Sequence, residues 1–406
     1  MFLNTVIGME EFNFDEIIDR RNTYSVKYDV LKELFGREDI TPLWVADMEF
    51  RSPQCIRDVL EKYVQSGIYG YNSEPPQMKP VIAQWQLQEH DWKVENDWIA
   101  FIPGIVRGIG FAINFFTKPG DKVVVQSPVY HPFTNVPVGN GRTVLRNPLK
   151  DGKMDLEHLD SLLAAEAPVK MMILCSPHNP GGYIWSREDM VELAEICHRH
   201  GTLVISDEIH ADLCLWGNRN ISFASVSDKA AEISITFGAP SKTFNIPGFA
   251  ASFAIAPNPD LAKPFFNWLS VNEFNHPSIF ASLGMITAFT EAKPWRDAAV
   301  KYIEKNILYL EEKFAAFRAG GEQLINPIRP QSSYLVWLDC RALLRRLAGR
   351  EALRPEDQAL LVDYFVNRVG IGLNDGMMFG PEGLGFMRIN AGCPRSMLGF
   401  ELPAVD

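Results

Sequence analysis

The chain has 406 residues, of which 47% are apolar and 22% charged, the composition of a globular protein. At roughly 150 residues per domain, this length predicts two domains or one large and one small domain. Acidic residues outnumber basic ones by 50 to 39, and the formal charge of -11 would repel a phosphate backbone. These values exclude a disordered or coiled-coil chain and a protein that binds nucleic acid through a general positive field.

No apolar run approaches the ~20 residues that cross a bilayer. The N-terminus, MFLNTVIGMEEF, has no Lys or Arg before its apolar residues and reaches Glu10 too early for a secretory signal. The six cysteines are scattered and form no C-x-x-C pair, so neither a zinc site nor a disulfide framework is indicated. We therefore expect a cytoplasmic protein with reduced thiols and no metal.

Short apolar runs alternate with helical stretches between residues 99 and 256, which is typical of a largely parallel sheet covered by helices. Most runs are uninterrupted, as expected of strands buried on both faces. The expected strands are 99–103, 122–126, 142–146, 170–176, 202–207, 233–237 and 249–256. Ser186, followed by two acidic residues, predicts a capped helix that runs to Gly201. We predict an α/β fold with a large, mostly parallel, seven-stranded sheet.

Long helical patterns replace this alternation after residue 258. Apolar residues at helical spacing predict a helix from Pro294 to about Ala319, and two further strands are expected at 334–339 and 385–390. The predicted organisation is a large domain and a smaller α+β domain assembled from both ends of the chain. The large domain covers 53–293, and the small domain combines 1–52 with 294–406.

Polar and glycine-rich motifs follow the predicted strands, at the sheet edge where open α/β folds bind ligands. PGIVRG (103–108) opens a helix and would turn free backbone N–H groups toward an anion. Five further polar side chains each follow a later strand: Tyr130, His131, Asn179, Asp207 and Lys242. Taken singly, each of these features also fits a plain turn, a packed loop residue or an ordinary salt bridge.

The motif SDEIHADL (206–213) holds three acids and one histidine, too dense a cluster to be comfortable without a nearby cation. A metal ion would supply that cation. Against a metal, the cluster contains only one histidine, and the next strand ends in a Ser, Thr and Pro-rich turn around Lys242. A salt bridge between one acid and this lysine remains open.

The order glycine turn, Tyr130, Asn179, Asp207 and Lys242 resembles the fold type I pyridoxal-phosphate (PLP) enzymes. More narrowly, the chain resembles the carbon–sulfur lyases of the MalY and PatB type, cystathionine β-lyase-like members of the aminotransferase class I/II superfamily. The resemblance covers roughly residues 12–398 and is highly specific as a set. Its motifs are FDEIIDRRNTYSVKYD, PLWVADMEF, GIYGYN, SPHNPGG, SDEIHADL, PSKTFNIPG, QSSYLVWLD and INAGCPRSML.

The resemblance implies a PLP cofactor and a role for each of these side chains. Lys242 would hold the cofactor as a Schiff base and later take the proton from the substrate α-carbon, since the pKa of a lysine falls readily on burial. Asp207 would pair with the pyridinium nitrogen and keep it protonated. Asn179 would donate a hydrogen bond to the phenolic oxygen, and Tyr130 would stack on the ring. Lys242 and Tyr130 are the expected catalytic residues.

The resemblance also implies a phosphate site and a homodimer. The phosphate would lie on the backbone of Ile105 and Val106, with help from Ser241 and from Tyr71 of a second subunit. Ala239 stands where related enzymes usually carry a phosphate-binding serine, so one contact is expected to be missing.

Two further residues receive roles from the resemblance. Arg388 would clamp the substrate α-carboxylate in a bidentate fork, a geometry that suits arginine better than lysine. His210 replaces the tyrosine of many aminotransferases and would support the cofactor oxygen or Asp207.

The implied activity is β-elimination, in which a cystathionine- or cysteine-type substrate yields a thiol, pyruvate and ammonia. An aminotransferase that uses the same residues is the first alternative, and a PLP-binding regulator that docks on a partner protein is the second.

The two ends of the chain differ from the family pattern. Relatives continue after CPRSxL with an amphipathic helix, whereas this chain runs GFELPAVD, which leaves the covering of the small domain open. The family normally begins near residue 9, so Met9 is the expected natural start.

Overall fold

The computed structural model describes residues 12–405. The expected start at Met9 and the first eleven residues of the segment MFLNTVIGMEEF therefore lie outside the described residues. Its large sheet has the strand order β2-β8-β7-β6-β5-β3-β4. The strands are β2 (Ile99–Ile102), β3 (Lys122–Ser127), β4 (Thr143–Pro148), β5 (Val169–Cys175), β6 (Leu203–Asp207), β7 (Ser234–Gly238) and β8 (Ser252–Ile255). All neighbours from β4 to β7 are parallel, whereas β8 is antiparallel to both β7 and β2. The predicted α/β class and the seven-stranded, mostly parallel sheet are confirmed.

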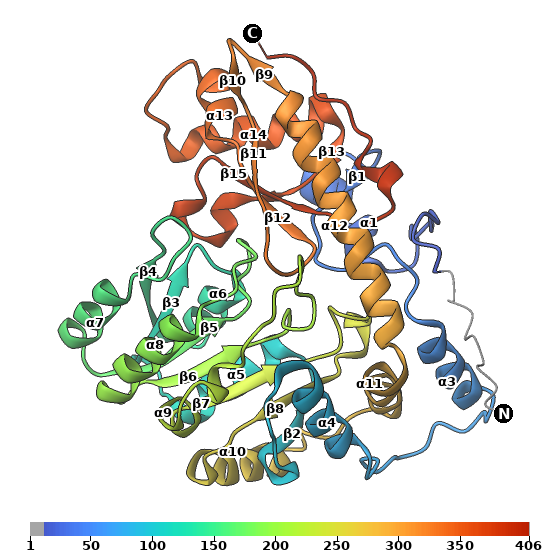
Figure 1. The fold of residues 1–406 in the computed structure, drawn as a ribbon, viewed down its shortest axis with the longest axis vertical. Helices are drawn as coiled ribbons and strands as arrows, with labels where there is room; N and C mark the ends of the chain where they lie inside the picture. The colour runs from blue at the N-terminus through green and yellow to red at the C-terminus, as the bar shows by residue number, and fades with distance from the viewer. Residues whose placement is uncertain (1–11, 406) are drawn as a thin grey trace, which may run out of the picture.

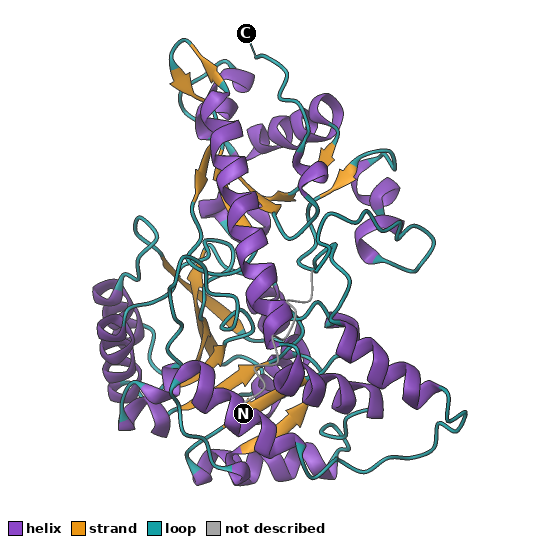
Figure 2. Ribbon diagram, turned by 45° about the vertical axis from the view of Figure 1, so that its right-hand side comes forward, coloured by secondary structure: helices purple, strands orange, loops and turns teal. Residues whose placement is uncertain are grey.

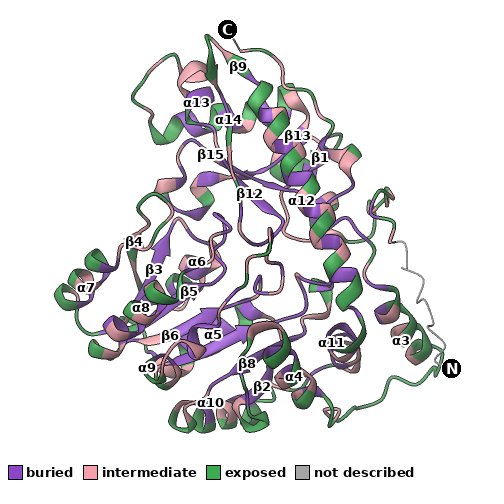
Figure 3. Ribbon diagram, in the orientation of Figure 1, coloured by how far each residue is buried: buried purple, intermediate pink, exposed green. Residues whose placement is uncertain are grey.

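Helices cover both faces of this sheet (Figure 1). Successive side chains of a strand point to opposite faces. Val123 and Val125 accordingly pack with helices α5 (Ile105–Phe116) and α10 (Pro259–Val271), while Val124 packs with helices α7 (Leu156–Ala165) and α8 (Arg187–Arg199). Two shorter helices, α6 (Pro132–Gly139) and α9 (Asp228–Glu232), complete these layers. Burial on both faces explains why the strands read as continuous apolar runs (Figure 3).

Most element boundaries lie within one or two residues of the sequence expectations, and two of them differ by three residues. The strand expected at 249–256 begins only at Ser252, because residues 247–249 form a tight turn. Helix α12 (Lys293–Ala316) ends before Ala319, since the chain there turns into a hairpin of β9 (Arg318–Ala319) and β10 (Glu322–Gln323). The hairpin turn is made by Gly320 and Gly321, both with positive φ, a conformation that glycine adopts at low cost.

A four-stranded antiparallel sheet forms the upper part of the molecule in Figure 1, with the order β11-β12-β15-β14. Its strands are β11 (Asn326–Ile328), β12 (Leu335–Asp339), β14 (Asn374–Asp375) and β15 (Phe386–Asn390), flanked by helices α13 (Arg341–Ala348) and α14 (Gln358–Asp363). The N-terminal strand β1 (Thr41–Pro42) pairs in parallel with β13 (Ile371–Gly372). This pairing joins an N-terminal segment to a C-terminal one in the same part of the molecule; the domain limits themselves stay a prediction.

Five helices complete the fold: α1 (Val26–Asp29), α2 (Leu31–Phe35), α3 (Gln54–Val64), α4 (Met78–His90) and α11 (Ile279–Glu291). The Trp85 and Phe289 rings stack at 4.8 Å between α4 and α11. Helix α12 runs from the level of the large sheet up to the small one (Figure 2). Within residues 12–405, none of the helices has the length and apolar character needed to cross a bilayer.

Residues 399–405 form no helix. The Phe400 ring contacts that of Phe314 at a centroid distance of 6.3 Å, and the Tyr364 hydroxyl donates to the Pro403 carbonyl at 2.8 Å. The irregular tail therefore covers apolar residues of this part of the molecule without a further helix.

Candidate active site

A cavity of about 290 Å³ opens at the carboxyl ends of the parallel strands. Eight of the residues predicted from the sequence line it: Ile105, Val106, Tyr130, Asn179, Asp207, His210, Ser241 and Lys242. They come from five different strand ends, and parallel strands bring such ends to one edge of a sheet. The fold therefore gathers side chains that are more than 130 residues apart in the sequence.

Lys242 follows β7 and lines the cavity as a half-buried side chain, and its amine donates a hydrogen bond to the Ala46 carbonyl. Burial lowers the pKa of this amine to about 8, against a smaller raising effect of the Asp47 carboxylate. A lysine with this pKa exists partly as the neutral amine near neutral pH, which is the form that attacks carbonyl groups and accepts protons.

Asp207 ends β6 on the floor of the same cavity and is 4% exposed. One carboxylate oxygen accepts the Ile209 N–H at 3.0 Å, and no cation of the described residues forms an ion pair with it. Burial raises the pKa of Asp207 to about 7. A buried carboxylate in this condition calls for a positively charged hydrogen-bond donor from a ligand.

Arg388 on β15 presents the opposite case, a guanidinium that is 4% exposed without a carboxylate partner among residues 12–405. It donates to Asn179 Oδ1 at 2.8 Å, Asn374 Oδ1 at 2.5 Å and the Trp44 carbonyl at 3.1 Å, and its Nε has no partner. Burial lowers the pKa of Arg388 to about 10. The group is positioned by neutral acceptors, so its charge remains available to an anionic ligand.

Asn179 connects these residues because its side-chain oxygen accepts from Arg388, which leaves its amide nitrogen to donate. Among the described residues that nitrogen has no acceptor. Tyr130 follows β3, and its backbone N–H donates to the Asn179 carbonyl at 3.1 Å. Burial raises the pKa of Tyr130, so its hydroxyl stays protonated near neutral pH. The adjacent His131 ring meets the Tyr130 ring edge-on at 5.1 Å and does not line the cavity.

His210 also lines the cavity, with a buried ring whose Nδ1 has no partner among residues 12–405. Burial lowers the pKa of His210 to about 3, with help from the charges of Lys242 and Arg388. The ring is therefore neutral and can exchange hydrogen bonds with a ligand without adding charge.

The end of the cavity expected to bind phosphate is formed by the start of α5 after Gly104. Gly104 has φ of 103°, a conformation that favours glycine, and it turns the first helical N–H groups toward the cavity. Ser241 and Ser252 line this cavity, whereas Ala239 is buried outside the lining. The hydroxyls available to an anion thus come from two serines, one of which the sequence analysis did not single out.

Tyr71 lies outside the cavity, in the loop between α3 and α4, and its side chain is fully exposed. In a single chain it has no part in the site. Its predicted contribution requires a second subunit and stays a prediction.

The acids of SDEIHADL point to three separate environments, so they form no common cluster. Asp207 lines the cavity, while Glu208 accepts from the Ser206 and Ser222 hydroxyls and from the Phe223 N–H. Asp212 accepts from the Trp85 indole at 2.9 Å and contacts the His90 ring at 2.8 Å. Within residues 12–405 no three His, Cys, Asp or Glu side chains lie close enough to hold a metal ion.

Several residues around the cavity were not identified as site residues from the sequence. Ala46 lines it, and the buried Tyr334 hydroxyl donates to the same Ala46 carbonyl as Lys242, at 2.9 Å. Asn374 holds Arg388, and Arg107 lies at the cavity mouth. Ala46 and Tyr334 lie in the motifs PLWVADMEF and QSSYLVWLD, which were the only sequence signal for them. A main-chain carbonyl acceptor such as that of Ala46 cannot be recognised from the side chain that the residue carries.

Comparison with known proteins gives a consistent picture. A family model described as aminotransferase class I and II matches residues 48–399. Cystathionine beta-lyase PatB of Bacillus subtilis (strain 168) is 41% identical over 390 residues, which cover 95% of this chain and 97% of PatB. Protein MalY of Escherichia coli (strain K12) is 32% identical over 395 residues, covering 95% and 96%.

Solved structures agree over nearly the whole length. Cystalysin from Treponema denticola, which contains a pyridoxal 5'-phosphate cofactor, superposes with a TM-score of 0.87 at 30% identity and covers 96% of both chains. The PLP-bound C-S lyase from Staphylococcus hominis gives a TM-score of 0.85 at 25% identity, covering 96% of this chain and 95% of that one. Because the family model spans most of the sequence and full-length relatives share its fold, the chain belongs to the aminotransferase class I and II family.

Proposed function

We propose that this protein is a PLP-dependent carbon–sulfur lyase that converts cystathionine- or cysteine-type amino acids to a thiol, pyruvate and ammonia. The observation that carries the proposal is the charge arrangement around one cavity. A buried carboxylate without a cation and a lysine with lowered pKa line this cavity, and a buried guanidinium without a carboxylate, that of Arg388, is hydrogen-bonded to Asn179 in the same lining. The names of PatB and of the Staphylococcus hominis lyase support the same activity.

The residues present fit PLP. Asp207 suits a protonated pyridine nitrogen, the free amide nitrogen of Asn179 suits the phenolic oxygen, and the start of α5 with Ser241 suits the phosphate. Lys242 would hold the cofactor through its amine, and Tyr130 lies on the cavity wall where a ring can stack. When bound, PLP withdraws electrons from the substrate Cα and so acidifies its proton.

Arg388 would orient the substrate. Its hydrogen bonds to Asn179, Asn374 and the Trp44 carbonyl fix the guanidinium plane before a ligand arrives, which reduces the entropy lost on binding the α-carboxylate. The Arg388 guanidinium also lies over the Phe379 ring at 4.9 Å, which holds it from one side.

Lys242 would move the proton. As a neutral amine it accepts the Cα proton, and the resulting ammonium can donate to the Ala46 carbonyl, which already accepts from it. Loss of the Cα proton allows the Cβ–S bond to break with its electron pair leaving on sulfur. Water then releases pyruvate and ammonia, so that cystathionine and water give homocysteine, pyruvate and ammonia.

The test is to incubate the PLP-loaded protein with L-cystathionine, L-cystine and L-cysteine without added keto acid and to measure pyruvate and thiol. We expect equal amounts of both products from cystathionine. Accumulation of the amine form of the cofactor with negligible pyruvate from all three substrates would instead identify an aminotransferase.

We further propose a cytoplasmic homodimer in which Tyr71 reaches the neighbouring subunit's phosphate site. Exposed apolar side chains gather near Tyr71, namely Val64, Ile68 and Tyr69. A mixture of refolded Tyr71→Ala and Lys242→Ala subunits tests this arrangement. If the sites are shared, each variant is inactive alone, and mixed dimers restore about a quarter of the parent activity, because half of the dimers carry one intact site. No recovery in proven mixed dimers would contradict the shared site.

A further inference from the structure

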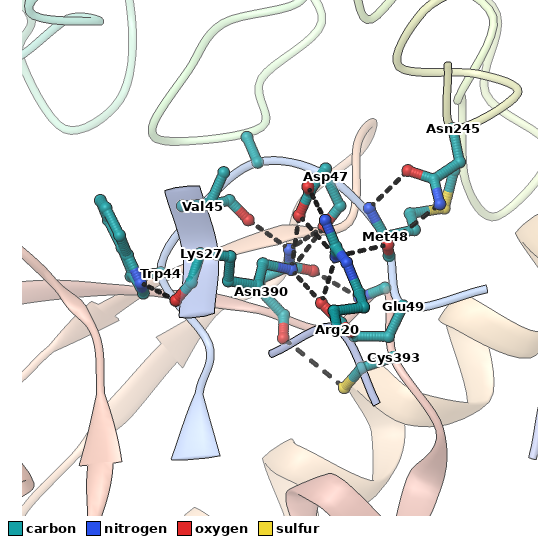
Figure 4. A network of polar contacts seen from close by, with 12 residues as sticks. Arg20, Lys27, Trp44, Val45, Asp47, Met48, Glu49, Asn245, Asn390 and Cys393 are labelled. Atoms are coloured by element: carbon teal, nitrogen blue, oxygen red, sulfur yellow. Dashed lines mark hydrogen bonds and ion pairs between the residues drawn. The ribbon is translucent and has the colours of Figure 1, made fainter. Parts of the chain in front are cut away.

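Residues 44–50, which we call the strap, are drawn in Figure 4, and one of them, Ala46, lines the cavity and accepts a hydrogen bond from Lys242. Its carbonyl groups are bound one after another by side chains from distant parts of the chain. The Trp44 carbonyl accepts from Arg388, and the Ala46 carbonyl accepts from Lys242 and Tyr334. The strap therefore joins the substrate-binding arginine to the proton-carrying lysine through its backbone.

Two asparagines fix the strap on either side of Ala46. Asn390 Nδ2 donates to the Val45 and Asp47 carbonyls at 2.7 and 2.6 Å. Asn245, three residues after Lys242, accepts the Met48 N–H at 2.9 Å and donates to the carbonyls of Met48 and Phe50. The loop that carries the lysine is thus attached directly to the strap.

A group of four charged side chains, of which Lys27 and Glu49 are buried and Arg20 and Asp47 are partly buried, contacts the strap (Figure 4). Lys27 is 1% exposed and contacts Asp47 Oδ1 at 2.8 Å and Glu49 Oε1 at 2.6 Å. Arg20 contacts Asp47 Oδ2 at 2.7 Å and Glu49 Oε1 at 2.9 Å. Two cations and two carboxylates balance in number, so removing one of the four leaves its partners partly uncompensated.

This group keeps Asp47 ionised. Burial opposes its charge, but Lys27 and Arg20 together hold the pKa of Asp47 below its ordinary value. Asp47 follows Ala46, the residue whose carbonyl accepts from Lys242. The charged groups that face Lys242 are the Asp47 and Asp207 carboxylates, which raise the pKa of the amine, and Arg388 and Lys27, which lower it. His210 faces the same cavity as a neutral ring.

We propose that Asp47 is a positioning residue: it fixes the Ala46 carbonyl beside the Lys242 amine and, in balance with Lys27, sets how strongly that amine holds its proton. The inference rests on the proposed function for its catalytic consequence. The physical claim concerns the chain alone, since every group in it is a side chain or carbonyl of this protein.

The test uses the full-length chain without bound cofactor and measures the rate of Lys242 modification by an amine reagent against pH, with the modified peptide quantified by mass spectrometry. Asp47→Asn removes a carboxylate and leaves the Lys27 cation less well balanced. The midpoint, which is the pH at which Lys242 is modified at half its maximal rate, should therefore fall by about one pH unit. Lys27→Met removes a cation and should move the midpoint upward. The double variant should lie between the two.

Opposite shifts distinguish electrostatic control from loss of structure, because a loosened strap would move both midpoints in the same direction, toward that of an exposed lysine. Asp39→Asn, which removes the exposed carboxylate of the Arg37–Asp39 pair, is the matched control and should leave the midpoint unchanged. If Asp47→Asn does not fold, Lys27→Met is compared with Lys27→Arg, which keeps the charge and should leave the midpoint unchanged, whereas an equal rise in both variants would indicate a loosened strap. An unchanged midpoint in folded Asp47→Asn or Lys27→Met, or shifts of one sign in these two variants, overturns the proposal.

The holoenzyme provides a second readout. In Asp47→Asn the acidic limb of the plot of kcat against pH should shift to lower pH, together with the midpoint of Lys242 modification. KM should change less than threefold because Arg388 keeps its contacts. If the Lys242 midpoints shift as expected but the protein releases no pyruvate, the inference about Asp47 is retained and the lyase function is rejected. A failure of the inference can therefore be distinguished from a failure of the proposed function.

Discussion

The two sides of the cavity differ in how their charges are satisfied. On the strand-end side, Asp207 is a buried carboxylate without a counter-ion among the described residues, and Arg388, which is hydrogen-bonded to Asn179 of the cavity lining, is a buried guanidinium bound only by neutral acceptors. On the strap side, Lys27, Asp47 and their neighbours form a balanced group of ion pairs.

The difference indicates what each side is for. An unpaired buried charge costs stability and is retained where a ligand completes it, whereas a paired group holds the backbone in place. Substitutions on the strand-end side should therefore reduce activity without reducing the free energy of unfolding, and those on the strap side should reduce stability. The following predictions test that division.

Lys242→Ala should produce the largest effect, a loss of turnover of at least about 10⁴-fold, because general base catalysis alone contributes about 10²- to 10⁴-fold and the attachment of the cofactor is lost as well. The measurement is pyruvate release from L-cystathionine. Borohydride fixation of the cofactor in the parent protein should mark Lys242, and a mark on another lysine would contradict the assignment.

Asp207→Asn should lower kcat by about 10²- to 10³-fold, as expected when one preorganised electrostatic contact is lost. The same change should stabilise the cofactor-free chain. The folded state raises the pKa of Asp207 to about 7, compared with about 3.9 when unfolded, so the folded chain binds more protons between these values and its stability falls as pH rises.

The variant lacks this dependence, so its stability advantage should grow between about pH 4 and 7, by at most about 1.4 kcal/mol per pH unit, and then stay level. Urea unfolding of both proteins at pH 5 and 8 measures it. An advantage that shrinks as pH rises would show that Asp207 has a cationic partner within the protein.

Arg388→Lys should raise KM by roughly 10- to 100-fold with a smaller change in kcat, because an ammonium cannot form the bidentate contact and charged hydrogen bonds contribute about 1.5–3 kcal/mol. Arg395→Lys is the matched control, since Arg395 donates to Asn306 away from the cavity. An unchanged KM in Arg388→Lys would exclude a bidentate carboxylate clamp.

On the strap side, Glu49→Gln should lower the free energy of unfolding by about 3 kcal/mol, because it leaves Lys27 and Arg20 partly uncompensated in a buried position. Tyr28 also donates to Glu49 at 2.9 Å and loses a charged acceptor. Thermal and urea unfolding measure the effect, with the exposed Asp39→Asn as a control that should match the parent. Equal stability of Glu49→Gln and the parent would remove the distinction between the two sides.

The smallest effect is expected at the phosphate end. Ser252→Ala should raise the PLP dissociation constant by about tenfold, the lower end of the range for one hydrogen bond to a charged group, whereas Ala239→Ser should change it less because residue 239 lies outside the cavity lining. Equilibrium dialysis against PLP compares the two. A larger effect of Ala239→Ser than of Ser252→Ala would indicate that the phosphate binds nearer to residue 239 than to Ser252.

Local sequence patterns were sufficient for the sheet and for the strand-end residues. Continuous apolar runs identify strands buried on both faces, and polar residues that follow them must meet at one edge, so Asp207 and Lys242 could be placed together before any coordinates. Boundaries were less certain where glycines or tight turns interrupt a pattern, as at the end of α12 and the start of β8.

The sequence by itself determined the fold class, the family and the residues that follow the large strands, because these depend on periodicity and on motifs a few residues long. Only the tertiary structure decided that the Ala46 carbonyl receives Lys242, that Arg388 is held by Asn374, and that the strap rests on a balanced group of charges. The physical reason is that these contacts join segments up to about 340 residues apart. Their acceptors are often main-chain carbonyls, which every residue carries and no pattern distinguishes.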